Sequence, residues 1–341
     1  MRNQKDVHHA HSKSSKVYIV TLDLPEKMLA FAKKGLLIPK EPFLNKIQQN
    51  LVTRLQEILP QYRVEAVQCR DMYHKITASV HELTKKNDML VVSSVPELVE
   101  KFGGVHLQIN RIVNCEGNLL GIGPRPGYSP IEQQIREIIF HAEQWPLILV
   151  EDGSFTGGTI CTVLETCRSR DIKLNYLVIG LLFDEARNAI EQTRGGMKIQ
   201  AVYQWEKDGF IDWLPDYDFF PFIPNAGRVV GHVYNGTIMP TYLHNGLSLS
   251  MPYILPYGRP VGWASLPNNL RIVSAFSLDC IHDTISIFEE MESLNHKKIT
   301  LDDLIGTYPR ASLAVTPKTH VFYEVEERIL DLLHDDAHML S

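Results

Sequence analysis

The chain has 341 residues, of which 44% are hydrophobic and 22% charged, enough for one large or two ordinary globular domains. Its net charge of -6 argues against a generic nucleic-acid binder, which usually carries a basic excess. The longest apolar runs, such as residues 176–183, are too short to cross a bilayer, and the first residues lack the apolar core of a signal peptide. We therefore expect a cytoplasmic protein that binds neither nucleic acid nor membrane.

Cysteine and histidine are placed without a metal-site pattern. The five cysteines include no Cys-x-x-Cys pair, which is typical of reduced thiols rather than of a zinc site or a disulfide framework. Residues 1–15 contain His8, His9 and His11, so a metal site is conceivable there. Because little in this segment is apolar, a disordered tail is the favoured interpretation.

The N-terminal region alternates strand and helix patterns. Residues 16–23 are rich in β-branched side chains and predict a strand, and residues 63–68 predict another. Apolar residues recur at helical spacing over residues 43–58 and again over 72–83. No chemical motif is present. We expect residues 16–87 to form an α/β extension that enlarges the sheet, covers one of its faces or mediates dimerisation.

Two further strands follow. Residues 88–94 predict a short apolar strand that runs into Ser93 and Ser94, and residues 106–113 predict the next strand. The Gly/Pro-rich run at 121–128 contains one cation, Arg125. It is not a dinucleotide fingerprint, because no Gly-x-Gly-x-x-Gly register opens a helix there. Ser129 and Pro130 then have the features of a helix start.

Residues 146–159 carry the strongest chemical signal. An apolar run at 147–150 ends in Glu151 and Asp152, and a short loop, 153–155, precedes Thr156-Gly157-Gly158-Thr159 and a helix from residue 160. Such a strand, loop and helix N-terminus directs backbone N–H groups and a helix dipole toward one spot, which suits a phosphate. The two carboxylates suit a polyol or a metal ion. Together they predict a site for a sugar phosphate.

After the motif, helix and strand patterns alternate at first and then become irregular. Helix and strand patterns alternate from 161 to 205, which favours a parallel α/β sheet with its ligand beyond the strand C-termini. Residues 209–224 are unusually rich in aromatic residues, acids and prolines. Residues 234–262 are loop-like, and helices are predicted over 275–295, after 300 and over 321–332. We expect 226–341 to be a mostly helical cap or dimerisation region.

The motif at 147–159 resembles the phosphoribosyl pyrophosphate (PRPP) signature of type I phosphoribosyltransferases: a hydrophobic strand, two acids, three variable residues and Thr-Gly-Gly-Thr. Glu151 stands for the first acid, as in some members. The resemblance implies a parallel sheet flanked by helices over 88–225. It also implies displacement of pyrophosphate from PRPP, or a related sugar pyrophosphate, by a nucleobase-like or amine nitrogen, with Mg²⁺ and usually as a homodimer. The alternative to a PRPP-binding motif is a strand, loop and helix whose similarity to the signature arose by chance.

The resemblance also assigns roles to individual residues. Glu151 and Asp152 would hold the ribose hydroxyls, directly or through Mg²⁺-bound water. The residues that would cradle the 5-phosphate are Gly153, Ser154, Phe155, Thr156, Gly157, Gly158 and Thr159. Ser93 and Ser94 occupy the position of the pyrophosphate loop, although a plain turn capped by Ser94 explains them equally well. Arg125 would contact pyrophosphate from a mobile loop, or would be a solvated surface residue.

The acceptor half of the site is less defined. Aromatic residues of the segment at 209–224 would form a hood over the acceptor, with Trp213, Tyr217 and Phe220 as candidates, or would simply pack on the core. Family members that act on 6-oxopurines carry an Asp where this chain has Phe155, and a phenyl ring has no proton to exchange. A hypoxanthine- or guanine-type mechanism is therefore not expected. A second functional hypothesis is a non-catalytic PRPP or nucleotide sensor, which is motivated by the unspecific residues at the pyrophosphate-loop position, the single cation Arg125 and the large additional regions. A PRPP-synthetase-like enzyme ranks lower, because no second sheet copy or ATP segment is visible.

Overall fold

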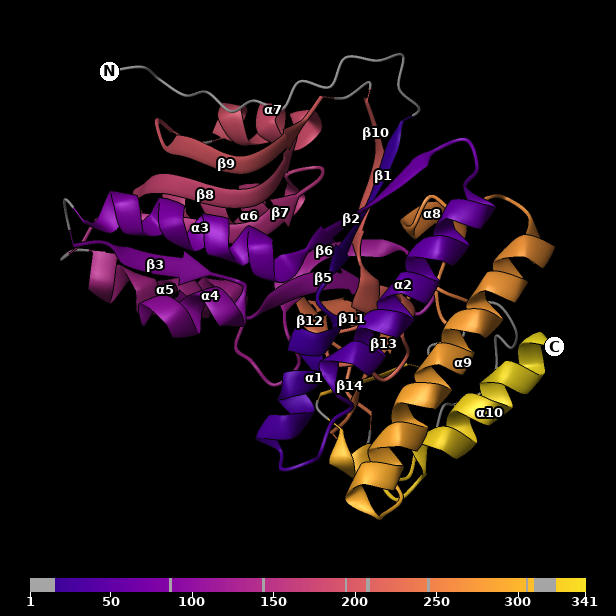
Figure 1. The fold of residues 1–341 in the computed structure, drawn as a ribbon. Helices are drawn as coiled ribbons and strands as arrows, with labels where there is room; N and C mark the ends of the chain where they lie inside the picture. Colours follow the sequence, from indigo (N-terminus) through magenta and orange to yellow (C-terminus); the bar gives the residue numbers. More distant parts are fainter. Residues whose placement is uncertain are drawn as a thin grey trace.

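The computed structural model arranges the described part of the chain around three β-sheets (Figure 1). The described residues are 16–85, 88–142, 145–193, 195–206, 209–243, 246–304, 306–309 and 323–341. The segment 1–15, for which we predicted disorder, lies outside them. Among the described residues no helix is long and apolar enough to cross a membrane.

The core sheet is a parallel sheet with the strand order β4-β3-β7-β8-β9. Its strands are β3 (Leu90–Ser93), β4 (Val105–His106), β7 (Leu147–Ser154), β8 (Leu174–Phe183) and β9 (Lys198–Trp205). One face is covered by α5 (Ile131–Ala142), α6 (Gly158–Arg168) and α7 (Asp184–Thr193), and the other by α3 (Cys69–Thr84) and α4 (Pro96–Phe102). The predicted parallel sheet flanked by helices is therefore confirmed.

Strand β7 shows why the apolar run before the acid pair is continuous. Leu147 and Leu149 pack into the cluster under α5, α6 and α7, whereas Ile148 and Val150 pack into the cluster under α3. All four side chains are fully buried. A parallel strand covered on both faces needs apolar residues at successive positions, so the alternation of polar and apolar residues is absent.

The second sheet, with the order β10-β1-β2, is also parallel and joins distant parts of the chain. It consists of β1 (Val17–Leu22), β2 (Arg63–Gln68) and β10 (Phe210–Pro215), and helices α1 (Leu24–Lys33) and α2 (Glu41–Ile58) follow β1. The aromatic segment at 209–224, for which we predicted a hood over the acceptor or packing on the core, contains strand β10 at 210–215. These residues form a strand because apolar side chains on both faces fill adjacent clusters, Phe210 in one and Leu214 in the other.

The third sheet has the order β14-β13-β11-β5-β6, with β12 paired to β11. Its strands are β5 (Ile109–Val113), β6 (Leu119–Pro124), β11 (Arg228–Tyr234), β12 (Thr237–Pro240), β13 (Ser248–Met251) and β14 (Thr307–Pro309). In the Gly/Pro-rich run at 121–128, which we expected to be a mobile loop, residues 121–124 thus belong to strand β6. A Cβ at Gly123 would lie 2.8 Å from Ile112 and 2.9 Å from the Ile238 carbonyl, so glycine here permits close strand packing.

The sheets do not follow the sequence boundaries that we drew. Residues 109–124 belong to the third sheet and 210–215 to the second, although both fall inside the span 88–225. The C-terminal part contains β11 to β14 as well as α8 (Pro260–Trp263), α9 (Leu270–Asn295) and α10 (Ile329–Leu340). The last helix begins at 329 rather than 321, because the Val325 and Glu327 carbonyls accept the N–H groups of Asp302 and Leu301 instead.

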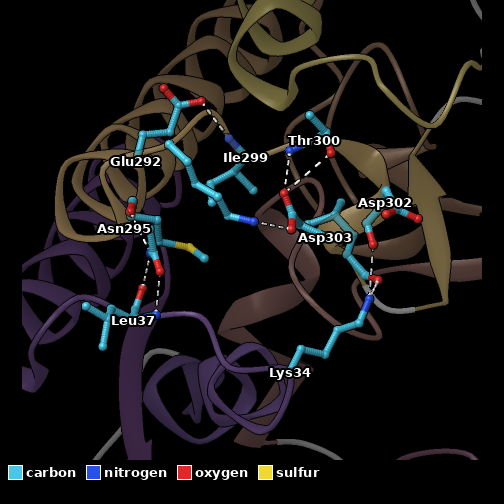
Figure 2. A network of polar contacts seen from close by, with 11 residues as sticks. Lys34, Leu37, Glu292, Asn295, Ile299, Thr300, Asp302 and Asp303 are labelled. Carbon is cyan, nitrogen blue, oxygen red and sulfur yellow. Dashed lines mark hydrogen bonds and ion pairs between the residues drawn. The ribbon is translucent and has the colours of Figure 1, made fainter.

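Polar contacts join the N-terminal helices to the end of α9 (Figure 2). The Asn295 amide pairs with the backbone of Leu37, accepting its N–H and donating to its carbonyl, both at 2.8 Å. Lys34 donates to the carbonyls of Asp302 and Leu304. The short 3-10 helix η3 (Leu301–Asp303) is closed by a capping box between Thr300 and Asp303. The Asn295 side chain of α9 and the backbone carbonyls of the loop after α9 therefore hold the α1–α2 connection in place.

Replacing Asn295 with Ala should lower the free energy of unfolding by about 1–2 kcal/mol, because two backbone groups of Leu37 lose their partner. Urea unfolding measures this change. Ser293→Ala, at an exposed position of the same helix, is the control and should change stability by less than about 0.5 kcal/mol. Equal effects of the two substitutions would contradict the role assigned to Asn295.

Candidate functional site

Strand β7 extends further into the motif than we expected. Its pairing with β8 continues through Gly153↔Leu181 and Ser154↔Leu182, so the loop that we predicted at 153–155 lies at 155–157. Helix α6 begins at Gly158, two residues earlier than predicted. The cause is β8, a buried ten-residue strand that offers ladder partners up to its own end. The acid pair therefore lies on rigid strand, and only three residues separate strand from helix.

The two glycines of the Thr-Gly-Gly-Thr run have different roles. Gly157 has φ +84, and a Cβ there would lie 3.1 Å from Ala189, so its conformation and the packing of α6 on α7 both require glycine. Above Gly158 the space is open, and the nearest atom to an added Cβ is Thr156 Oγ1 at 3.7 Å. No side chain caps α6. The first-turn N–H groups thus face an accessible space that suits an anion.

Glu151 is joined to the turn after β3. Ser94 donates its backbone N–H to Glu151 Oε1 (3.1 Å) and its hydroxyl to Oε2 (2.5 Å), while Arg125 Nη2 donates to the Ser94 carbonyl (3.2 Å). Three residues proposed separately from the sequence are therefore neighbours. Arg125 also donates from Nε to the Ile109 carbonyl (3.2 Å) and is half-buried, so it is not a freely solvated surface residue, and its contact with pyrophosphate stays a prediction. Ser93 is buried, and its hydroxyl accepts the Val95 N–H and so stabilises the turn.

Glu151 and Asp152 differ in their surroundings. Burial raises the pKa of Glu151 to about 7, with Asp152 adding to the rise and Ser94 opposing it. Burial also raises the pKa of Asp152, and Lys27 opposes that rise most strongly. Asp152 accepts the Gly153 N–H at 2.7 Å. Glu151 is thus hydrogen-bonded to Ser94, whereas Lys27 of the N-terminal region favours the charged form of Asp152.

Lys27 is a part of the site that sequence reasoning missed. Its Nζ lies 3.6 Å from Asp23 Oδ2, 3.7 Å from Glu97 Oε1 and 5.0 Å from the Tyr217 ring centroid. The only available signal was positional: Asp23 follows the first strand directly and Lys27 is one helical turn further on. Without the β1–β10 pairing, nothing in the sequence places this strand end near the motif.

Asp23 forms a buried carboxyl pair with Asp216. The Asp216 carboxylate accepts the Asp23 and Leu24 N–H groups (3.2 and 3.3 Å) and the Gln48 amide (2.5 Å). Asp23 Oδ1 has no hydrogen-bond donor among the described residues. Burial raises the pKa of Asp23 well above its usual value, and Asp216 adds to the rise. Asp23 therefore keeps its proton to a higher pH than an exposed carboxyl group does.

The aromatic residues near the motif divide into packed and accessible ones. Phe155 meets Phe183 and Phe210 edge-on, at centroid distances of 5.7 and 5.3 Å. Trp213 is buried; its Nε1 donates to Thr21, and its ring lies so close to Gly153 that a Cβ there would be 2.6 Å away.

Phe220 is fully buried, whereas Tyr217 is half-buried beside Lys27. Of the three residues predicted to contact the acceptor, only Tyr217 combines partial exposure with a place at the site. The acceptor-binding role of all three stays a prediction.

Among the residues that the structure describes, side chains alone do not form a magnesium site. Over the described ranges no group of three or more His, Cys, Asp or Glu side chains could hold a metal ion. Glu151 and Asp152 are engaged by different neighbours, Ser94 and Gly153. The residues present therefore fit only an ion that arrives with a diphosphate, and we assign no chemical step to it.

A separate cavity of about 680 Å³ lies on the C-terminal part, away from the motif. It is lined by Glu116, Leu255, Gly258, Arg259, Pro260, Val261, Gly262, Asn268, Asn269, Leu270 and Val273. None of these residues belongs to the motif or its neighbours. We therefore locate the candidate site by the carboxyl groups and the uncapped helix N-terminus of the motif, and not by the size of a cavity.

Comparison with known proteins adds little. No family model matches the chain, and no curated protein matches it. Among solved structures, the AQ2163 protein from Aquifex aeolicus is similar over 51% of this chain and 91% of its own, with 16% sequence identity and a TM-score of 0.30. A likeness at this level supports no conclusion about fold or function.

The pKa of Glu151 predicts a pH dependence of stability. Because burial raises this pKa from 4.5 to about 7, the folded state holds the proton more tightly than the unfolded state. The resulting stabilisation is present below pH 4.5 and is lost as the pH rises through 7. Relative to Glu151→Gln, the wild-type free energy of unfolding should fall by up to about 3 kcal/mol between pH 4.5 and 8.

Urea unfolding of both proteins across this pH range measures the difference. Glu137→Gln, at an exposed position on α5, is the matched control and should parallel the wild type. Parallel curves for wild type and Glu151→Gln would show that Glu151 does not carry the raised pKa.

Proposed function

We propose that the protein is a phosphoribosyltransferase-type enzyme that displaces pyrophosphate from PRPP, or a related sugar pyrophosphate, with a nitrogen nucleophile. One observation carries the proposal: the uncapped N-terminus of α6 and the acid pair lie within one rigid strand-to-helix connection at the C-terminal edge of a parallel sheet. That edge is where open α/β sheets bind ligands. The substrate and reaction follow from the motif resemblance together with this geometry.

The phosphate end of the substrate fits the start of α6. Thr156 and Gly158 are exposed, and the space above Gly158 is open. Backbone N–H groups of the first helical turn and the helix dipole attract a dianionic phosphate. A bare Cα at Gly158 allows the 5-phosphate to approach the backbone directly. Binding of the phosphate at this position needs no movement of β7 or α6.

The ribose end fits the carboxyl groups. Asp152 accepts hydrogen bonds from ribose hydroxyls, and Glu151, with a pKa of about 7, is able to accept or donate near neutral pH. In the reaction the bond from C1 to the pyrophosphate oxygen breaks, and a bond from C1 to nitrogen forms as the nitrogen loses its proton. Positive charge develops on the sugar ring, which the carboxylates stabilise, while Arg125 offsets charge on the departing pyrophosphate.

A non-catalytic PRPP or nucleotide sensor is the second candidate. It is favoured by the anchoring of Arg125 and by the pairing of β6 with β5, since the segment expected to close over a reaction is already fixed. A preformed site of this kind suits binding without turnover. The sensor predicts PRPP binding with no pyrophosphate release.

Gly158→Ala should abolish PRPP binding without unfolding the protein. The added methyl has room in the free protein but occupies the space where the phosphate would approach. Isothermal titration with PRPP and Mg²⁺ should show at least tenfold weaker binding for Gly158→Ala and for Asp152→Ala, with unchanged thermal unfolding of Gly158→Ala. Gly262→Ala is the control, because its methyl also meets open space but lies outside the motif.

A pyrophosphate-release screen against a panel of bases and amines separates the two candidates. Release that depends on Asp152 supports the enzyme, and binding without release supports the sensor. Both candidate functions would be refuted if the wild type did not bind PRPP, or if Gly158→Ala and Asp152→Ala bound PRPP as tightly as the wild type.

A further inference from the structure

A half-buried histidine, His106, ends strand β4 beside the candidate site. Strand β4 pairs in parallel with β3, and the register places His106 next to Ser93 at the C-terminal edge of the core sheet. The ring nitrogen Nε2 lies 3.3 Å from the Ser94 carbonyl, and Nδ1 contacts the side-chain amide of Gln108. Because Ser94 donates its N–H and hydroxyl to Glu151, hydrogen bonds connect His106 to the acid pair.

The two partners of the ring define its protonation state. A carbonyl oxygen can only accept, so Nε2 carries a proton and donates it to Ser94. The amide nitrogen of Gln108 can only donate, so Nδ1 carries no proton and accepts. His106 is therefore a neutral imidazole with its proton on Nε2.

The charged groups around the ring agree with a neutral imidazole. Burial lowers the pKa of His106 most, and the positive charge of Arg125 lowers it further. The hydrogen bond to Ser94 and the carboxylates of Glu97 and Glu100 on α4 oppose this change. The net shift is downward from 6.5, so His106 gains a second proton only in acidic solution.

Arg125 determines how the Gln108 amide is oriented. Arg125 Nη1 lies 3.5 Å from Gln108 Oε1, so the amide directs its oxygen to Arg125 and its nitrogen to His106. The reverse orientation would place the amide N–H₂ group against a guanidinium, which has no acceptor. The backbone of Gln108 is also held, because its carbonyl accepts the Arg125 N–H (2.9 Å) and its N–H donates to Gln134 of α5 (2.8 Å).

A second proton on His106 does not fit this network. The new Nδ1–H would point at the amide nitrogen of Gln108, and reversing the amide would direct that nitrogen to Arg125. The imidazolium and Arg125 would also be two cations that share one acceptor, the Ser94 carbonyl, at 3.3 and 3.2 Å. Protonation therefore breaks at least one hydrogen bond that positions Ser94 or Arg125.

We propose that His106 is a positioning residue whose neutral form holds Ser94 and Arg125 in the arrangement that binds ligand, so that protonation of His106 weakens binding at the motif. Ser94 is the hydrogen-bond partner of Glu151, and Arg125 is the cation that the proposed reaction assigns to pyrophosphate. The effect on PRPP rests on the proposed function, whereas the linkage among the four side chains does not.

Nitrogen-15 NMR tests the network without ligand. His106, identified by the signals missing from His106→Gln, should show the Nε2–H tautomer at pH 7.5 and titrate with a midpoint below 6.5. The Ser94 amide and Arg125 Nε–H signals should shift with this midpoint in the wild type and lack that shift in His106→Gln. The variant is needed because Glu151, with a pKa of about 7, titrates in a neighbouring range. A proton on Nδ1, or Ser94 and Arg125 signals that do not follow His106, would overturn the proposal.

Isothermal titration with PRPP and Mg²⁺ at pH 7.5 and 5.0 measures the effect on binding. His106→Gln keeps a neutral donor for Ser94 but cannot be protonated. From pH 7.5 to 5.0 the wild type should lose about threefold or more affinity beyond the loss of His106→Gln, because the titrations of PRPP and Glu151 are common to both. His282→Gln, at an exposed position of α9, should match the wild type. Thermal unfolding at both pH values shows that all three proteins are folded.

The two measurements separate this proposal from the proposed function. If PRPP binds and the wild type and His106→Gln lose the same affinity at pH 5.0, the role of His106 is refuted and the proposed function stands. If the wild type binds no PRPP but its Ser94 and Arg125 signals follow His106, the proposed function is refuted and the positioning role is supported.

Discussion

The site depends on the alternation of side chains along β7. Successive residues of a strand point to opposite faces, and both faces of β7 are buried under helices. At the end of the strand, where the cover stops, the same alternation separates Glu151 from Asp152. Glu151 accepts hydrogen bonds from Ser94, whereas the charged form of Asp152 is favoured by Lys27. Two adjacent carboxyl groups thereby acquire different surroundings.

Close backbone packing keeps the layers around β7 in register. Gly153 admits the Trp213 ring, and at Gly180 a Cβ would lie 2.3 Å from the Asp152 carbonyl and 2.5 Å from Met72 Sδ. The first contact joins the core sheet to the second sheet, and the second brings α3 onto the core sheet. Because neither position has room for a side chain, the Trp213 ring and the Met72 thioether pack directly on the backbone of the core sheet.

Local patterns in the sequence predicted most of the core sheet and its helices. The apolar run at 147–150 and the helical spacing at 43–58 depend on neighbours in the chain, and both elements are present in the structure. The motif also led to Ser94, Arg125 and Glu151, which the structure brings together. The role of these residues in binding stays a prediction.

Long-range pairing is what the sequence did not reveal. Strand β10 was hidden because its aromatic residues and its terminal Pro215 are typical of an irregular segment, and its partner β1 lies some 190 residues earlier. Lys27 was missed for the same reason. It stands on an element without a motif and lies near the motif only through a sheet that joins distant segments.

The β1–β10 pairing also sets an order of assembly. On the ribosome β1 emerges first, yet it lies between β2 and a strand that emerges only after the whole core sheet. Until residue 215 is available, one edge of β1 is unpaired, and such an edge is prone to pair with other chains. The core sheet has all of its strands before that point. Lys27 and Asp216 therefore complete the candidate site late in synthesis, so a chain interrupted before β10 would carry the acid pair without its N-terminal partners.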